Sequence, residues 1–161
     1  MQQTFRTIDV SIREVKPTPV AIMEHHGDPA MLGATIQRFI GWRKANGFSP
    51  KTSKTFNVFH SDPRTTNLSE FRLDLCVEVP LTFETSDANI ISGTLPGGRC
   101  AVLRVSGNTD DLEPAALYLY RDWLPNSGEE AQDFPLYCQR IAFFPEVAEH
   151  ETIAELYLPL K

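Results

Sequence analysis

The most restrictive feature of this 161-residue sequence is that its second half repeats the pattern of the first. Three pairs of segments match in the same order along the chain: Val20–Gly27 with Cys100–Gly107, Trp42–Gly47 with Trp123–Gly128, and Asp74–Val77 with Glu155–Leu158. The first pair is shifted by 80 residues (107 − 27) and the other two by 81 (128 − 47 and 155 − 74). A single period of this length is too long for a solenoid, so it predicts a duplicated unit.

Each half shows the same order of strand-like and helix-like patterns. In the first half, strands are predicted at Thr7–Glu14, Val20–His25, Phe56–Phe59 and Leu73–Val79. In the second half they are predicted at Asn89–Leu95, Cys100–Val105, Leu136–Phe143 and Ile153–Leu158. A helix falls in the middle of each half, so the order in each is β-β-α-β-β.

Capping residues and apolar spacing place the two helices. Asp28, followed by Pro29, starts the first one, which ends near Gly47; Asp110 and Asp111 open the second. The predicted apolar faces are Leu32, Ile36, Phe39 and Ile40 on the first helix, and Leu112, Ala116, Leu119, Trp123 and Leu124 on the second.

These patterns predict an α+β fold in one domain spanning 1–161, with internal repeats of about 1–80 and 88–161. Two β-α-β-β units would form an antiparallel sheet that carries two helices, with a pseudo-two-fold axis through a central cleft. Junctions between similar halves are favoured places for ligand pockets.

Composition and charge narrow the classes of function. The net charge is −6, and the Lys and Arg residues form no cluster, which argues against direct binding to nucleic acid. No apolar run approaches the length of a membrane span and no secretory signal is visible, so a cytoplasmic location is expected. Cys76, Cys100 and Cys138 are widely spaced, which is typical of buried free thiols.

Four motifs, ordered along nearly the whole chain, resemble those of one known family. They are Gly97–Val102 (GGRCAV), Leu119–Gly128 (LYRDWLPNSG), Arg72–Val77 (RLDLCV) and Leu156–Leu160 (LYLPL). The sequence resembles the GyrI-like (gyrase-inhibitor-like) proteins, which are related to the effector-binding domains of AraC-type and multidrug-responsive transcription regulators. The resemblance implies two β-α-β-β units around a cleft that takes bulky, often cationic, aromatic compounds. In those regulators a helix-turn-helix domain usually precedes this module, but here Val20 already lies in the first unit, so the sensing module without a DNA-binding domain is expected.

One position departs from the family pattern. Relatives commonly carry a buried glutamate in the strand after the second helix, where this sequence has Gln139 or, in another alignment, Cys138. A carboxylate repays the desolvation of a cationic ligand by charge pairing, whereas an amide offers only a dipole. Glu155 is the expected substitute acid, with Glu78 and Asp74 as other candidates.

Seven residues are predicted to bind the ligand: Gln139, Tyr137, Trp123, Trp42, Phe59, Tyr120 and Glu155. Tyr137 and Gln139 alternate on one strand and so share a face. Trp42 and Trp123 hold matching places in the repeat and could sandwich a flat ligand. The alternative for both is that each anchors its helix to the sheet.

No metal, cofactor or catalytic site is expected. His25 and His26 are adjacent on a strand and therefore point to opposite faces, and His60 and His150 lack ligand spacing. No nucleophile–base arrangement is visible, and Gln139 cannot act as a general base. The prediction is a stand-alone module for amphipathic aromatic compounds, cationic ones included. Two alternatives stay open: an inhibitor that binds a protein such as DNA gyrase, and a hydrolase of electrophilic toxins.

Overall fold

The computed structural model describes residues 5–61, 65–107, 109, 111–143 and 146–161. Its eight strands are β1 (Val10–Val15), β2 (Thr18–His26), β3 (Thr55–Phe59), β4 (Arg72–Glu78), β5 (Ile91–Leu95), β6 (Gly98–Gly107), β7 (Tyr137–Ala142) and β8 (Thr152–Pro159). The longest helix is α1 (Leu32–Asn46). A second helical stretch consists of α2 (Glu113–Leu117), the π-helical segment η4 (Tyr118–Trp123) and α3 (Leu124–Ser127). The chain has the predicted α+β fold with antiparallel strand pairs.

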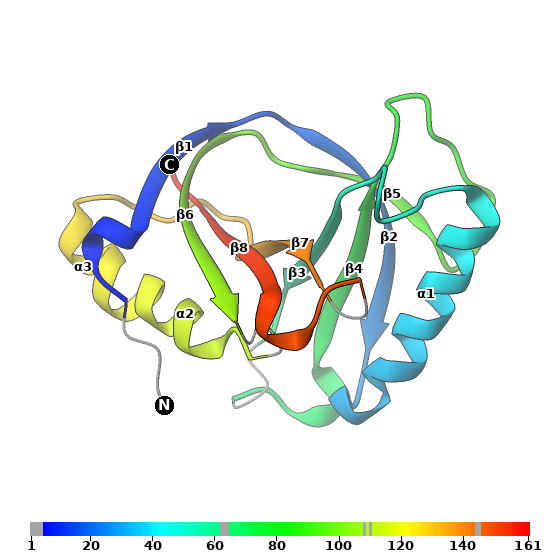
Figure 1. Ribbon diagram of the computed structural model, residues 1–161, viewed down its shortest axis with the longest axis horizontal. Coiled ribbons are helices and arrows are strands. Elements are labelled where there is room, and N and C mark those ends of the chain that lie inside the picture. Colours follow the sequence, from blue (N-terminus) through cyan, green and yellow to red (C-terminus); the bar gives the residue numbers. More distant parts are fainter. Residues whose placement is uncertain (1–4, 62–64, 108, 110, 144–145) are drawn as a thin grey trace. The chain divides into compact units, whose positions relative to one another are not determined.

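The strands group into two compact units. One unit, residues 17–95, contains β2, β3, β4 and β5, in the order β3-β4-β2-β5. The other, residues 1–16 and 96–161, contains β1, β6, β7 and β8, in the order β7-β8-β6-β1. Figure 1 shows α1 beside the first set of strands and α2 beside the second. We call these units the 17–95 unit and the 96–161 unit.

The repeat is visible in the register of the strand pairs. Val20 pairs with Glu78 in one unit, and Cys100 pairs with Pro159 in the other, so the shifts are 80 (100 − 20) and 81 (159 − 78). Likewise Phe56 pairs with Cys76, and Tyr137 with Tyr157, with a shift of 81 for both partners (137 − 56 and 157 − 76). The two units therefore share one hydrogen-bonding plan.

The first strand of each predicted repeat pairs with the other repeat. β1 pairs with β6 and β5 pairs with β2, in equivalent registers: Val15 lies opposite Gly98 and Leu95 lies opposite Thr18. The sequence repeat and the compact unit thus differ by the exchange of one strand. Local sequence could not predict this exchange, because the choice of a strand's partner is set by distant residues.

Glycine sits where both copies need a left-handed backbone. Gly47 ends α1 with φ of 77°, and Gly128 ends α3 with φ of 75°. Only glycine adopts such angles without strain from a Cβ. The end predicted for the first helix near Gly47 is therefore confirmed, and the second helix ends at the equivalent glycine.

The starts of the two helices differ in detail. Asp28 Oδ1 accepts a hydrogen bond from the amide of Ala30, as expected of a cap, and the 3-10 turn Pro29–Met31 precedes α1. In the other unit, the side chain of Asp111 accepts from the amide of Glu113, where α2 begins. Asp110 lies outside the described residues.

The buried face of α1 differs from the prediction. Thr35, Phe39 and Arg43 are its buried residues, whereas Ile36 and Ile40 are 36% and 37% exposed. The polar side chains are buried because the fold satisfies them. Thr35 Oγ1 lies 2.7 Å from Nδ1 of His25.

Arg43 holds the segment after α1. Its guanidinium donates to the carbonyls of Phe48 (2.9 Å) and Ser53 (3.2 Å) and to Oγ1 of Thr55 (2.9 Å). Burial lowers the pKa of this guanidinium. The core that α1 covers contains Ala21, Met23, Phe39, Phe71, Leu73, Leu75, Val77, Val79 and Ile90.

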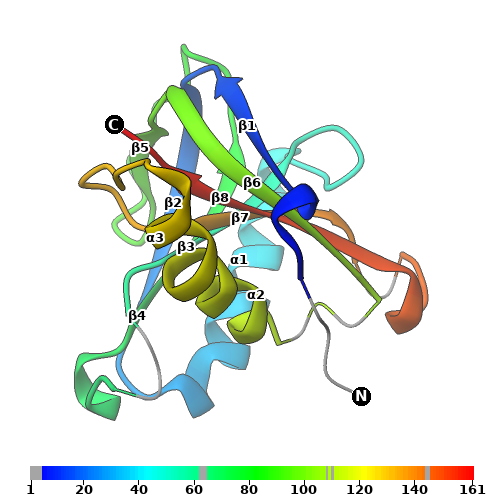
Figure 2. The ribbon, with the colours of Figure 1, turned by 90° about the vertical axis from the view of Figure 1, so that its left-hand side faces the viewer.

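The π-helical segment explains why the shift changes from 80 to 81. Buried Thr35 and Phe39 of α1 correspond to buried Ala115 and Leu119 with a shift of 80 (115 − 35 and 119 − 39). The C-terminal glycines are shifted by 81, so one extra residue enters the helix after Leu119. A π-turn absorbs one additional residue without breaking the helix, and Figure 2 shows α2, η4 and α3 as one continuous helix.

Among the described residues, none of the helices is long and apolar enough to cross a membrane.

Candidate functional site

Aromatic and polar side chains gather on one face of the 96–161 unit. Tyr137 and Tyr157 are cross-strand partners, with ring centroids 5.0 Å apart and planes within 5° of parallel. The next pair on this face is Gln139 and Glu155. The hydroxyl of Tyr157 lies 3.2 Å from Oε1 of Glu155 and 3.5 Å from Oε1 of Gln139. A hydroxyl, an amide and a carboxylate thus converge beside two stacked rings, as the alternation of β7 predicted for Tyr137 and Gln139.

Glu155 is the electrostatic centre of this group. Its side chain is only 5% exposed, and Oε2 lies 3.1 Å from Nη2 of Arg13 and 3.4 Å from Nε of Arg104. Arg104 is the cross-strand partner of Glu155, while Arg13 reaches it from β1. The buried carboxylate is stable because cationic and hydroxyl groups satisfy both of its oxygens.

Burial shapes the acid–base behaviour of the two tyrosines. Loss of hydration, together with the nearby Glu155 carboxylate, raises the pKa of Tyr157 to about 12. Burial also raises the pKa of Tyr137, whose hydroxyl interacts with the thiol of Cys100. Both hydroxyls are therefore neutral hydrogen-bonding groups at physiological pH.

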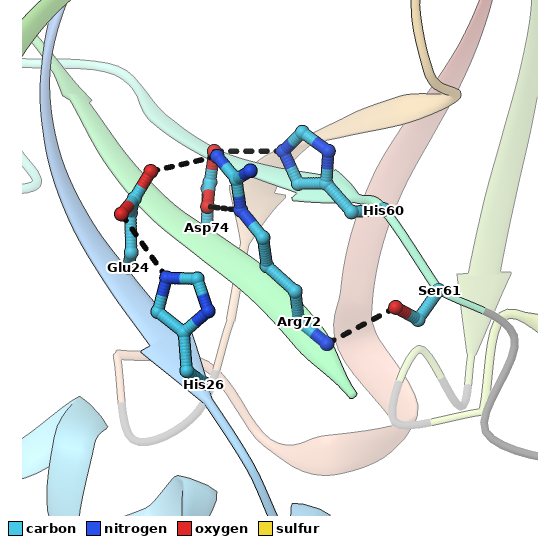
Figure 3. A network of polar contacts seen from close by, with 6 residues as sticks. All are labelled: Glu24, His26, His60, Ser61, Arg72 and Asp74. Atoms are coloured by element: carbon cyan, nitrogen blue, oxygen red, sulfur yellow. Dashed lines mark hydrogen bonds and ion pairs between the residues drawn. The ribbon is translucent and has the colours of Figure 1, made fainter. Parts of the chain in front are cut away.

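The 17–95 unit carries an ionic network at the equivalent place, shown in Figure 3. Asp74, which corresponds to Glu155 (155 − 74 = 81), lies 3.2 Å from Nε of Arg72 and 2.8 Å from Nε2 of His60. Arg72 Nη2 also lies 2.7 Å from Glu24, whose other oxygen is 3.1 Å from Nε2 of His26. We call Glu24, His26, His60, Arg72 and Asp74 the Arg72 network.

Two predicted ligand residues belong to the apolar core of the 17–95 unit. Trp42 stacks on Phe39 (centroids 6.0 Å apart) and Phe48 (5.6 Å) and meets Phe83 edge-on (6.0 Å). Phe59 packs against the same core. The anchoring alternative therefore describes the contacts that Trp42 makes within its own unit.

The two remaining predicted residues lie on the helical segment η4. Trp123 is 7% exposed, whereas Tyr120 is 43% exposed. The structure thus brings together Tyr137, Gln139 and Glu155 through direct strand pairing and contacts, and it buries Trp123 separately on the helix. The other acid candidate, Glu78, ends β4 and is half-buried.

Sequence reasoning missed Arg13 and Arg104 as members of this group, and it did not count Tyr157 among the ligand residues. Tyr157 had a visible signal, because it alternates with Glu155 on the last strand. Arg13 had none, since its approach to Glu155 follows from the exchange of β1. The histidines behave as the alternation predicts: His25 is 3% exposed, whereas the His26 side chain is 60% exposed. No group of three or more potential metal ligands occurs within the described part of the chain.

The chain is similar to one group of known proteins in sequence and to another in fold. Over 158 residues the chain is 36% identical to the probable transcriptional regulator YgiV of Escherichia coli K12, covering 98% of this chain and 99% of that protein. Among solved structures, the EcmrR C-terminal domain superposes with a TM-score of 0.75 at 18% identity, covering 94% of this chain and 96% of that domain. EcmrR in its complex with DNA gives a TM-score of 0.76 at 16% identity, and there the match spans 57% of the longer EcmrR chain.

The match to a protein family extends over nearly all of the sequence. Residues 8–161 match the family described as the GyrI-like small molecule binding domain. This span includes both units, both helices and the Glu155 group. The chain therefore belongs to the GyrI-like family of small-molecule-binding domains.

Proposed function

We propose that the protein binds amphipathic aromatic compounds, and that Gln139, Glu155 and Tyr157 form the polar end of the site. The observation that carries this proposal is the convergence of their oxygens beside the stacked rings of Tyr137 and Tyr157. Ligand sites are mostly apolar and hold a few convergent polar groups that fix orientation.

Binding explains this group better than catalysis does. A general base must be able to take a proton from the substrate. Gln139 is an amide, and Glu155 is already held by Arg13, Arg104 and the hydroxyl of Tyr157. We therefore assign the protein a role without chemical turnover.

The relatives support a sensing or sequestering role. The similar Escherichia coli protein is named a probable transcriptional regulator, and a ligand-binding domain of this kind would report an effector to a partner. The net charge of −6 opposes direct contact with DNA. The three buried free cysteines suit a reducing compartment, which supports the proposal of a cytoplasmic location.

A thermal-shift panel of aromatic compounds tests the proposal. A ligand that binds only the native state raises the melting temperature as its concentration rises. Hits should then be measured by calorimetry against wild type and Gln139→Leu, which removes the amide but keeps similar bulk. Ile36→Ala on the exposed side of α1 is the matched control.

We expect Gln139→Leu to weaken binding about 5–15-fold, the scale of one hydrogen bond to a buried group, and Ile36→Ala to leave it unchanged. A panel without any saturable hit, or hits that Gln139→Leu and Ile36→Ala affect equally, would count against the proposed site.

A further inference from the structure

The repeat places residues of opposite charge at equivalent positions. Glu24 on β2 faces Asp74, and Arg104 on β6 faces Glu155, with shifts of 80 (104 − 24) and 81 (155 − 74). Asp74 and Glu155 are equivalent carboxylates of the two units. The residue opposite is an acid, Glu24, in one unit and a base, Arg104, in the other. The two units share a backbone plan but differ in local charge.

A count of formal charges gives the size of this difference. In the Arg72 network, the carboxylates of Glu24 and Asp74 surround one guanidinium, so with neutral histidines the network has one surplus negative charge (Figure 3). In the 96–161 unit, the guanidiniums of Arg13 and Arg104 surround the single carboxylate of Glu155, which leaves one surplus positive charge.

Exposure decides which charge an incoming molecule meets. The Glu155 side chain is 5% exposed, whereas those of Arg13 and Arg104 are 47% and 56% exposed. Each guanidinium has five N–H donors. Each contacts Oε2 of Glu155 through a single nitrogen, and Nε of Arg13 also donates to Oγ of Ser11. Donors for a second anion therefore remain at an accessible place, while the buried carboxylate keeps both arginines in position.

We propose that Arg13 and Arg104 form an anion subsite, and that the ligand of this protein carries a carboxylate or sulfonate on its aromatic body. This inference rests on the proposed function and specifies the charge of its ligand. Planar guanidinium groups match carboxylates in paired hydrogen bonds. Gln139 fits the same assignment, because an amide does not repel an anion.

Three probes of nearly identical shape test the sign of the charge: naphthalene-2-carboxylate, its neutral carboxamide and its cationic carboxamidine. Titration calorimetry at 0.15 M salt should show the carboxylate binding about tenfold more tightly than the carboxamide, with the carboxamidine weakest. Raising the salt concentration should reduce the preference, since exposed charges are screened.

Variants locate the preference. Arg104→Gln and Arg13→Gln should each remove most of the advantage of the carboxylate, because each leaves the other arginine to balance Glu155. Arg104→Lys keeps the charge without the planar fork and should restore it in part. Arg121→Gln, which removes an exposed charge from η4, is the matched control and should change nothing.

Glu155→Gln gives the sharpest contrast. Removal of its charge frees both guanidiniums and should tighten binding of the carboxylate severalfold. If Glu155 is instead the counter-charge of a cationic ligand, the same variant should weaken the carboxamidine and leave the carboxylate unaltered.

The outcomes separate this inference from the proposed function. Equal binding of all three probes, or preference for the carboxamidine, overturns the anion subsite while leaving a binding module in place. Absence of binding by all three probes and by every compound of the thermal-shift panel overturns both. A carboxylate preference that Arg121→Gln removes as fully as Arg104→Gln would also refute the assignment to these two arginines.

Discussion

Replacing Trp42 by alanine tests whether this residue is an anchor of the 17–95 unit. The side chain makes three aromatic contacts, with Phe39, Phe48 and Phe83. Each such pair contributes about 0.5–1.5 kcal/mol beyond its buried area, and truncation of a fully buried tryptophan costs about 3–5 kcal/mol. Trp42 is half-buried, so we expect Trp42→Ala to lower the free energy of unfolding by about 3 kcal/mol.

This loss corresponds to a fall of about 6–12 °C in melting temperature for a chain of this size. Urea titration followed by circular dichroism measures the free energy, and calorimetry on the folded variant measures affinity for a hit of the thermal-shift panel. Trp42→Phe keeps an aromatic ring and should lose about half as much stability. Affinity should stay within twofold of wild type in both variants. A stability loss below about 1 kcal/mol combined with a tenfold loss of affinity would show that Trp42 is a ligand platform instead.

Three further substitutions test other parts of the structure. Tyr157→Phe should make stability less sensitive to alkali. The pKa of Tyr157 in the folded protein is about 12, above the usual 10, so Tyr157 adds stability that is complete below pH 10 and is lost as the pH rises toward 12. Urea midpoints measured from pH 9 to 12 should therefore fall less steeply in the variant than in wild type. Arg43→Met should cost on the order of 2–4 kcal/mol, because two carbonyls and a hydroxyl lose a buried donor, and equal urea midpoints for variant and wild type would contradict this. Gly128→Ala should destabilise the protein by about 1 kcal/mol, because the φ of Gly128 is 75°. Gly41→Ala lies within α1, with open space around its Cβ position, and should stabilise the protein by about 0.5–1 kcal/mol. Thermal unfolding that ranks the two variants the other way would refute the assigned helix end.

The strands were predictable because their signals are local. Alternation and turn residues placed all eight, although Thr7–Asp9, predicted as the start of the first strand, forms a 3-10 turn before β1. The repeat gave the correspondence between Asp74 and Glu155 that the registers bear out. The predicted buried face of α1 was wrong at Ile36 and Ile40. Apolar character alone could not reveal that Thr35 and Arg43 have polar partners inside the fold.

The candidate site likewise contains a part that local sequence predicts and a part that it does not. Tyr137, Gln139 and Glu155 meet because neighbouring strands bring together residues that alternate on one face. The aromatic neighbours of Trp42 come from α1 and from the segments around Phe48 and Phe83, which local sequence does not connect. The shared cleft between the two halves, and the sandwich of Trp42 and Trp123 across it, stay predictions.

The exchange of β1 and β5 also determines when each part of the protein becomes complete as it leaves the ribosome. Residues 17–95 form one uninterrupted segment, so all the strands of that unit are present once Leu95 has emerged. β1 is synthesised first, yet its partner β6 begins only at Gly98, 83 residues after Val15 (98 − 15). Domains made early fold early, and closing a long loop costs entropy before any contact repays it. Residues 17–95 should therefore fold first, whereas β1 pairs only after β6 has been synthesised.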